Sequence, residues 1–113
     1  MAIHIIAEAG VNHNGNTALA RALVDVAAEA SADAVKFQTF RAEALASRAV
    51  PKADYQKSTT GDADGQVEML KALELAYDDH RMLAERCRER GLVFLSTPFD
   101  PASLRFLTEE LDL

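Results

Sequence analysis

The feature that most constrains the fold is a regular alternation of two kinds of segment. Short apolar runs rich in β-branched residues, which are typical of strands, occupy residues 3–7, 34–39 and 92–97. Between them apolar residues recur at helical spacing, as in residues 18–30. Strands that alternate with helices pair in parallel through right-handed crossovers. The pattern therefore predicts an α/β fold, either a doubly wound sheet or part of a (β/α)8 barrel.

Capping residues set the expected ends of two helices. Asn16 or Thr17 can begin the first helix, and Ser31 follows its end, where a glycine is more usual. Asp78 is expected to cap the second of these helices, which Gly91 ends.

Three further segments complete the expected order of elements. Residues 40–65 lack a clear period and predict a long loop, which at that length is usually functional or mobile. Residues 66–75 predict a short helix. After the third strand, Asp100 followed by Pro101 predicts a helix start, because proline is favoured at the first helical position.

Polar side chains stand at the carboxyl end of each predicted strand. Side chains alternate along a strand, so Lys36 and Gln38 share one face of the second strand. Glu8 follows the first strand, and either Thr97 or Ser96 ends the third on the corresponding face. In parallel α/β folds this edge of the sheet binds ligands. The sequence therefore predicts a binding site formed by these side chains.

Lys36 lies near the middle of an apolar strand, and we expect it to be buried. A buried ammonium group is costly unless it is paired. One interpretation is a structural ion pair with Glu8 that holds neighbouring strands in register. The other is a carboxylate beside a cation that binds an anionic substrate, and both can hold in an empty site.

The remaining residues with reactive side chains have structural interpretations. His13 is expected to be a hydrogen-bonding loop residue rather than a base or a ligand. His80 and Cys87 are expected in the core, and His4 lies toward the edge opposite the site. The arginines within residues 86–90 are expected to form a solvated helix end. The sequence contains no Cys/His metal-ligand spacing, phosphate loop or dinucleotide fingerprint.

The charge balance argues against nucleic acid as the main partner. The 113 residues contain 12 Lys and Arg against 18 Asp and Glu, a formal charge of −6, whereas phosphate backbones need clustered cations. No run approaches the ~20 apolar residues of a membrane helix, and the N-terminus lacks the pattern of a signal peptide. A single cysteine fits a reducing compartment. We expect a cytoplasmic protein with small-molecule ligands and no nucleic-acid or membrane partner.

Three motifs resemble the N-terminal part of the sialic acid synthase family, which includes N-acetylneuraminate synthase and related nonulosonate and spore-coat polysaccharide synthases. They are IIAEAGVNHNG at 5–15, ADAVKFQTF at 32–40 and FLSTPFD at 94–100, in the family's order and spacing. The resemblance implies a (β/α)8 TIM barrel. It also implies a transferase that condenses phosphoenolpyruvate with an N-acylated aminosugar aldehyde, such as N-acetylmannosamine, giving a sialic or nonulosonic acid and phosphate. The motifs favour this family over related synthases of other keto-sugar acids.

Carried over position by position, the resemblance implies roles for four residues. Glu8 and Lys36 are similar to catalytic residues of the family, Glu8 near the reacting centre and Lys36 at phosphoenolpyruvate. Gln38 is implied to face the sugar, and Thr97 to lie near the phosphoenolpyruvate carboxylate. The resemblance also implies a divalent metal, Mn or Mg, that activates the aldehyde.

Family members are much longer than this chain. We therefore expect residues 1–113 to be the N-terminal portion of the synthase domain, covering about the first three β/α units of a barrel of eight. The metal ligands are expected outside this chain. A partial barrel leaves strand edges and an apolar face open, so the isolated chain is expected to be inactive and to form a homo-oligomer. The alternative is a non-catalytic truncated fragment that acts only as a self-associating structural module.

Overall fold

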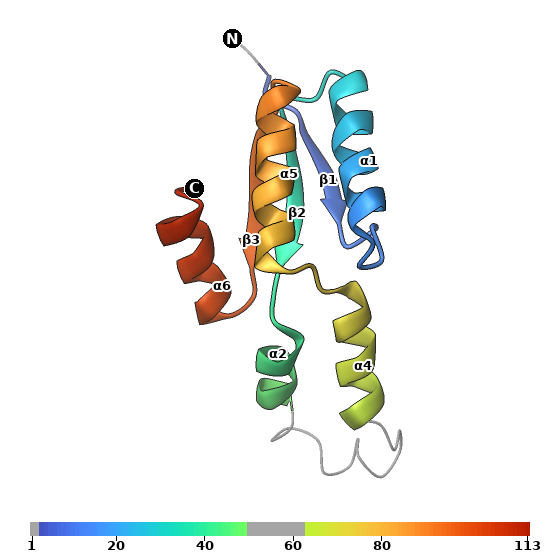
Figure 1. Cartoon of the computed structure of the whole chain (residues 1–113), viewed down its shortest axis with the longest axis vertical. Coiled ribbons are helices and arrows are strands. Elements are labelled where there is room, and N and C mark those ends of the chain that lie inside the picture. The colour runs from blue at the N-terminus through green and yellow to red at the C-terminus, as the bar shows by residue number, and fades with distance from the viewer. Residues whose placement is uncertain (1–2, 50–62) are drawn as a thin grey trace.

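The fold is built on a parallel sheet of three strands, and a computed structural model describes it over residues 3–49 and 63–113 (Figure 1). The strands lie in the spatial order β1 (Ile6–Gly10), β2 (Ala34–Thr39) and β3 (Val93–Pro98). Both pairs are parallel, with Ala34 opposite Ile6 on one side and Val93 on the other. The prediction of an α/β fold with parallel strands is therefore confirmed.

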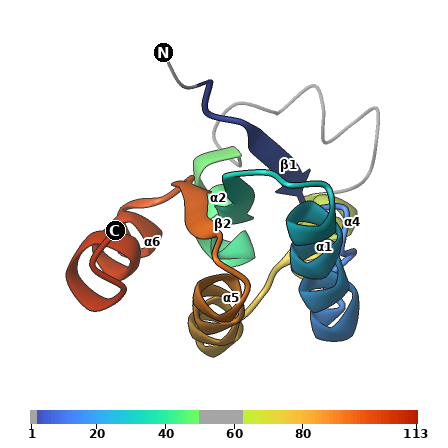
Figure 2. The ribbon, with the colours of Figure 1, turned by 90° about the horizontal axis from the view of Figure 1, so that it is seen from above.

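Helices cover one face of the sheet and extend beyond its end. Two of them, α1 (Thr17–Glu29) and α5 (Tyr77–Glu89), lie on the same side of the strands (Figure 2). Past the carboxyl ends of the strands lie α2 (Ala42–Ala49) and α4 (Ala63–Leu73) (Figure 1). After β3 the chain forms α6 (Pro101–Arg105) and a π-helical stretch, η2 (Phe106–Glu110). In the part that the structure describes, none of these helices is long and apolar enough to cross a membrane.

The hydrophobic core lies between the sheet and the helices α1 and α5. Its buried side chains come from both layers and include Val24, Val35, Phe37, Leu83 and Phe94. The rings of Phe37 and Phe94 stack with centroids 5.8 Å apart. Because side chains alternate along a strand, burial of Phe37 against the helices directs Lys36 and Gln38 to the opposite face. That face is open, since Ile6 and Val93 on it are 49% and 50% exposed.

The strand β1 begins later than the strand predicted over residues 3–7. It pairs with β2 only from the point where β2 itself begins, at Ala34. Ile5 precedes the strand but is tied to the next connection, because its N–H donates to the Asp33 carboxylate at 2.7 Å. Its carbonyl accepts the Asp33 N–H at 2.8 Å. At its other end, β1 pairs with β2 as far as Gly10, three residues further than predicted.

The ends of α1 and α5 follow the predicted capping residues in most respects. Asn16 caps α1, since its side chain accepts the Leu19 N–H at 3.0 Å. Ser31 follows α1 with φ of +63°, and Gly91 follows α5 with φ of +73°. Both residues thus take the left-handed conformation that ends many helices. Ser31 takes it without the conformational freedom of a glycine.

Two predictions about the middle of the chain are wrong. Residues 40–65 were expected to form a loop, but α2 and the start of α4 lie within them, because the segment AEALASRA consists mainly of good helix formers. The rest of that predicted loop, 50–62, lies outside the described residues. Asp78 is not the N-cap of α5. The cap is Ala76, which offers no side-chain hydrogen bond, and Asp78 lies in the first turn.

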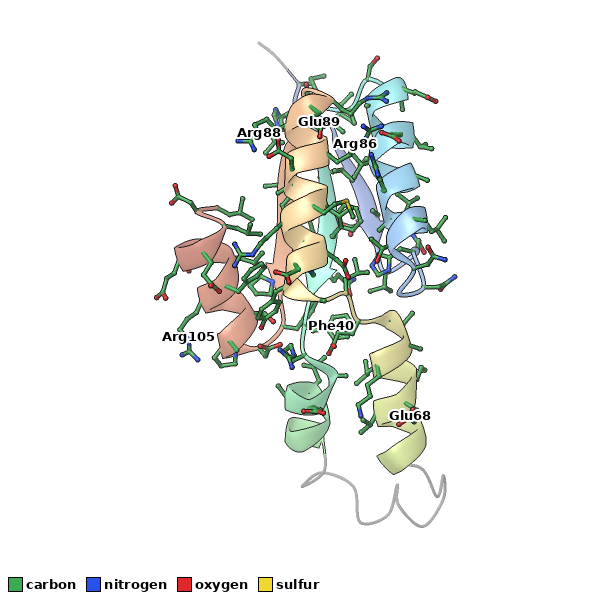
Figure 3. The ribbon with its side chains drawn as sticks, in the orientation of Figure 1. Phe40, Glu68, Arg86, Arg88, Glu89 and Arg105 are labelled. Carbon is green, nitrogen blue, oxygen red and sulfur yellow. The ribbon has the colours of Figure 1, made fainter. Side chains whose placement is uncertain are left out.

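An ion-pair cluster joins α1 to the C-terminal end of α5, where Arg86 is labelled in Figure 3. The Asp25 Oδ1 atom lies 2.9 Å from Arg86 Nη2 and 3.3 Å from Arg90 Nη1. The hydrogen bond from Arg86 holds the pKa of Asp25 below its usual value, despite some desolvation. Two of the arginines predicted to be a solvated helix end therefore link the two helices. Cys87 of α5 is buried in the core, as predicted. Burial raises the pKa of its thiol to about 12, so the thiol stays protonated.

Candidate functional site

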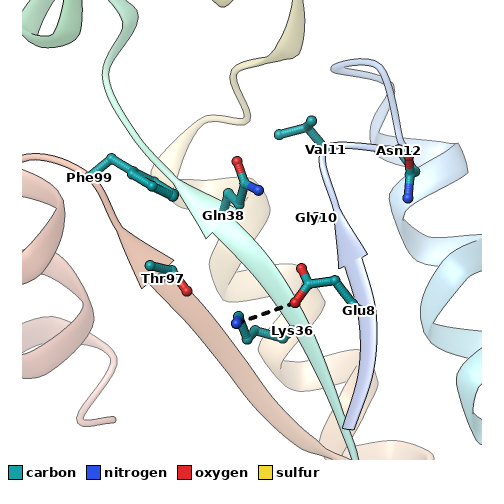
Figure 4. A pocket seen from close by; sticks show the side chains of 8 residues that line it. All are labelled: Glu8, Gly10, Val11, Asn12, Lys36, Gln38, Thr97 and Phe99. Carbon is teal, nitrogen blue, oxygen red and sulfur yellow. Dashed lines mark ion pairs between the residues drawn. The ribbon is translucent and has the colours of Figure 1, made fainter.

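The register of the sheet brings the four predicted site residues to one face. Glu8 stands opposite Lys36 across β1 and β2, and Gln38 stands opposite Thr97 across β2 and β3. All four line one open pocket of about 450 Å³ (Figure 4). The rest of its lining consists of Gly10, Val11, Asn12 and Phe99. The predicted convergence at one edge is therefore confirmed, and Thr97 rather than Ser96 lines the pocket.

An ion pair joins Glu8 and Lys36 in this pocket. The Glu8 Oε2 atom lies 3.3 Å from Lys36 Nζ, and the two side chains are 53% and 39% exposed. The expectation that Lys36 is buried is wrong, because the residues that the structure describes do not cover this face of the sheet. A half-exposed pair of this kind contributes only ~0–1 kcal/mol to stability. The ammonium group is thus accessible to an anionic ligand while a carboxylate holds it in place.

Gly10 provides the space between Glu8 and Gln38. Its φ of +55° lies in the left-handed region, and the register of the ladder shifts between Glu8 and Gly10. A Cβ at this position would lie 3.4 Å from Glu8 Oε1 and 3.7 Å from Gln38 Nε2. A side chain there would therefore be strained by the backbone conformation and would come into contact with two site residues. Sequence reasoning missed Gly10 as a site residue, although a glycine close to a strand end often marks a bulge or a close approach.

Three other lining residues were also missed. Val11 and Asn12 follow β1, and Phe99, which is 41% exposed, follows β3. Loops that follow the carboxyl ends of parallel strands commonly form the rims of binding sites. Position after a strand was the available signal, and it carried no information about which loop side chains turn toward the pocket.

His13 and His80 lie outside the pocket lining, and both are fully buried. The Gly15 N–H donates to His13 Nδ1 at 2.9 Å, and His80 Nδ1 donates to the Ala76 carbonyl at 2.9 Å. The His13 ring also stacks on Phe37, with centroids 6.1 Å apart. Burial lowers the pKa of both imidazoles, and the proximity of His80 lowers that of His13 further. The structural interpretation of both histidines is confirmed.

The metal implied by the resemblance does not fit the residues in view. Among residues 3–49 and 63–113, no group of three or more His, Cys, Asp and Glu side chains could hold a metal ion. His13 and His80 are buried away from the pocket, and His4 is exposed before β1 begins.

The chain is similar to a known family and to characterised enzymes. A model of the NeuB family matches residues 23–113. The N,N'-diacetyllegionaminic acid synthases of Legionella pneumophila and Campylobacter jejuni are 53% and 46% identical to it, over 95% and 93% of this chain. The N-acetylneuraminate-9-phosphate synthase of Homo sapiens is 33% identical over 93% of this chain. These alignments cover 30%, 31% and 29% of the relatives, so the chain spans about 30% of their length.

Two solved structures show the same fold. The N-acetylneuraminic acid (sialic acid) synthetase of Leptospira borgpetersenii, solved in complex with citrate, superimposes with a TM-score of 0.74 and 32% identity, over 96% of this chain and 33% of that one. The spore coat polysaccharide biosynthesis protein SpsE of Bacillus subtilis superimposes with a TM-score of 0.65 and 37% identity, over 96% of this chain and 27% of that one. The three parallel strands and their helices therefore match part of the TIM barrel of these proteins.

Proposed function

The chain belongs to the NeuB family of sialic and nonulosonic acid synthases, and on that premise we propose that it supplies part of a condensing active site. The proposed substrates are phosphoenolpyruvate and an N-acylated aminosugar aldehyde, and the products are a nonulosonic acid and phosphate. The observation that carries the proposal is the convergence of Glu8, Lys36, Gln38 and Thr97 on one pocket. In the same proposal residues 1–113 are the N-terminal portion of a synthase domain, whose barrel is completed by further β/α units.

Lys36 is the proposed contact for phosphoenolpyruvate. The substrate carries a carboxylate and a phosphate, and Lys36 offers a compact positive charge on a half-exposed side chain. A cation fixed beside the developing charges of a reaction stabilises them without reorganising at the moment of reaction. Glu8 partners the ammonium group when the site is empty and, in this proposal, lies beside the reacting centre when it is filled.

Gln38 and Thr97 are the proposed orienting groups. Their side chains are partly buried in the pocket, which restricts their motion while leaving their polar atoms available. The amide of Gln38 offers both a donor and an acceptor to a sugar, and the hydroxyl of Thr97 can donate to the phosphoenolpyruvate carboxylate. Holding two reactants in such an arrangement removes much of the entropic barrier to bond formation.

The proposed reaction forms one carbon–carbon bond and releases one phosphate. The methylene carbon of phosphoenolpyruvate attacks the aldehyde carbon, and the aldehyde oxygen takes up a proton. Water adds to the former enol carbon, and loss of phosphate leaves a keto acid. A divalent metal held by residues outside this chain would supply Lewis-acid polarisation of the aldehyde, and the proposed role of the residues described for this chain is to bind and orient the anionic reactant.

The sugar substrate is proposed to carry two acetamido groups. This chain is 53% and 46% identical to two N,N'-diacetyllegionaminic acid synthases, compared with 33% for the human N-acetylneuraminate-9-phosphate synthase. The difference favours a product with two N-acetyl groups over a product with one.

A binding experiment tests the proposed site on the chain as it stands. Phosphoenolpyruvate is titrated into the ¹⁵N-labelled chain to millimolar concentrations, with inorganic phosphate and pyruvate in parallel, and amide shifts are recorded by NMR. The expected result is weak saturable binding that moves the amides of Lys36, Gln38 and Thr97, without turnover of an added aminosugar. Lys36→Gln should abolish the effect. Lys71→Gln is the matched control, because Lys71 is 47% exposed and pairs with Glu43 away from the pocket.

Two outcomes would contradict the proposal. One is the absence of any shift at these amides in the unsubstituted chain. The other is an equal loss of binding in the Lys36 and Lys71 variants, which would indicate a general response to net charge.

A second candidate function rests on the open face of the sheet. Ile6 and Val93 flank Ala34 in one row of this face and remain half-exposed. Exposed apolar rows promote association, so the chain can act as a self-associating structural module without catalysis. A ligand-indifferent oligomer in the titration above would favour this second function.

A further inference from the structure

Asp100 is a buried carboxylate next to the carboxyl ends of β2 and β3. It is 5% exposed and does not line the pocket. Both of its oxygens accept a hydrogen bond from Ser103, and one of them also accepts from Arg41. Oδ1 accepts the Ser103 N–H at 2.8 Å, while Oδ2 accepts the Arg41 N–H at 2.8 Å and the Ser103 hydroxyl at 2.9 Å. One side chain therefore caps α6, which follows β3, and also holds the residue that follows β2 by two positions.

The link lies directly beyond the bond between the two strands that runs from the Phe99 N–H to the Thr39 carbonyl at 3.0 Å. The Val93 N–H likewise donates to the Asp33 carbonyl, so alternate N–H groups of β3 face β2, and the missing N–H of Pro98 is not one of them. The hydroxyls of Thr39 and Ser96 add a side-chain bond of 2.6 Å between the two strands. Beyond these contacts the segments that follow β2 and β3 diverge into α2 and α6.

The Arg41 amide is a suitable donor for this link. Its carbonyl accepts the Ala44 N–H at 3.0 Å, so Arg41 occupies the position that begins α2. An N–H at a helix start has no partner inside the helix and must find one elsewhere. Burial opposes ionisation of Asp100, but its hydrogen bonds from Arg41 and Ser103 outweigh burial and hold its pKa below the usual value.

We propose that Asp100 is a positioning residue, which fixes the separation of Gln38 and Thr97 in the pocket through its bond to the Arg41 N–H. Gln38 lies three residues before Arg41, and Thr97 lies three residues before Asp100, so the link closes a short ring directly beyond the two side chains. The inference concerns the same pocket as the proposed function and rests on it only for the identity of the ligand.

The substitution Asp100→Asn separates this role from helix capping. Asparagine is as good an N-cap as aspartate, because its amide oxygen can still accept the Ser103 N–H. Its second terminal atom is an NH₂ group, which cannot accept the Arg41 N–H. Two control variants keep the link. Ser103→Ala removes only the hydroxyl contact, and Arg41→Ala removes the guanidinium group, which lies over the Tyr77 ring, while keeping the backbone N–H.

Amide hydrogen exchange and NMR shifts of the full chain provide the readouts. In Asp100→Asn, exchange at Arg41 and Phe99 should accelerate about tenfold or more, as expected when a hydrogen bond to a charged acceptor is lost. The amide signals of Gln38 and Thr97 should shift, while exchange at Leu83 in the core should change much less. Both control variants should leave the Gln38 and Thr97 signals in place. Phosphoenolpyruvate should bind the Asp100 variant several-fold more weakly than either control.

Three results would overturn the inference. The first is an equal acceleration of exchange at Leu83 and Arg41 in Asp100→Asn, which would indicate a loss of global stability alone. The others are unchanged amide signals of Gln38 and Thr97 in Asp100→Asn, or equal shifts of those signals in the control variants. If the unsubstituted chain binds no phosphoenolpyruvate, the proposed function fails, but the exchange and shift results still decide the role of Asp100.

Discussion

The Glu8 carboxylate lies 3.3 Å from the Lys36 ammonium group across β1 and β2, and both side chains are about half open to solvent. An arrangement of this kind places a competitor for the cation inside the proposed anion site. Under the proposed function, the carboxylate would lose part of its contact with Lys36, or share it, when phosphoenolpyruvate binds.

Glu8→Gln is therefore expected to strengthen the binding of phosphoenolpyruvate by the isolated chain, since it removes a negative charge beside the ligand. The free energy of unfolding should change by less than ~1 kcal/mol, as for other exposed ion pairs. Titration followed by NMR and urea denaturation measure the two effects. Glu43→Gln is the control for charge alone, because Glu43 lies on α2 and pairs with Lys71. Weaker binding in Glu8→Gln would contradict the competition.

Gly10→Ala should disturb the pocket, and Gly91→Ala should not. Both glycines have positive φ, so both substitutions should lower the free energy of unfolding by ~1–2 kcal/mol. Only at Gly10 would the added Cβ meet site atoms, Glu8 Oε1 and Gln38 Nε2, whereas at Gly91 it meets nothing within 4 Å. Chemical denaturation and the amide signals of Lys36 and Gln38 check the prediction. Signals that move equally in the two variants would refute the special role of Gly10.

Ser31→Gly should stabilise the chain by ~1 kcal/mol. Ser31 ends α1 with φ of +63°, which glycine adopts without the steric cost borne by other residues. Ala22→Gly on the exposed side of the same helix is the matched control and should destabilise by ~1 kcal/mol, because its backbone is helical. Thermal and urea unfolding should therefore move in opposite directions for the two variants.

The stability of the chain should fall when the pH falls below about 6.5. Burial lowers the pKa of His13 and His80 from the ordinary value of 6.5, so the folded chain binds fewer protons than the unfolded chain below that pH. The contribution of these two histidines to the free energy of unfolding is thus fully present above pH 6.5, and it decreases progressively as the pH falls below that value. Urea denaturation at a series of pH values measures the slope. His80→Gln should flatten it, and an unchanged slope in both His80→Gln and His13→Gln would show that other groups carry the effect.

The open face of the sheet should drive self-association of the isolated chain. Replacing both Ile6 and Val93 by lysine puts charges into the exposed apolar row, and sedimentation should then show a shift toward monomer. Val26→Lys is the control, because Val26 is 59% exposed but lies on α1. An unsubstituted chain that is monomeric at high concentration would contradict this prediction.

Local patterns were sufficient to predict much of the fold and the arrangement of the site. The apolar run of β2 and the alternation of Lys36 with Phe37 determined both the strand and the face that each side chain occupies. Asn16 and Gly91 correctly marked the ends of helices, because capping depends on a few neighbouring residues.

Features that depend on partners distant in sequence were predicted less well. The start of β1 follows from where β2 begins, and the exposure of Lys36 follows from what covers the sheet. The pocket lining by Phe99 and the double role of Asp100 depend on how loops turn after the strands. No local pattern in the sequence carries that information.

The spatial order of the strands, β1-β2-β3, is also their order in the chain. Each strand that leaves the ribosome therefore meets an edge that has already been made, and no strand has to wait for a later one to be inserted between it and its neighbour. The rim that carries Glu8, Lys36, Gln38 and Thr97 can form in the nascent polypeptide as soon as β3 emerges. Synthesis from the N-terminus thus presents the strands of the pocket in the order in which they pair.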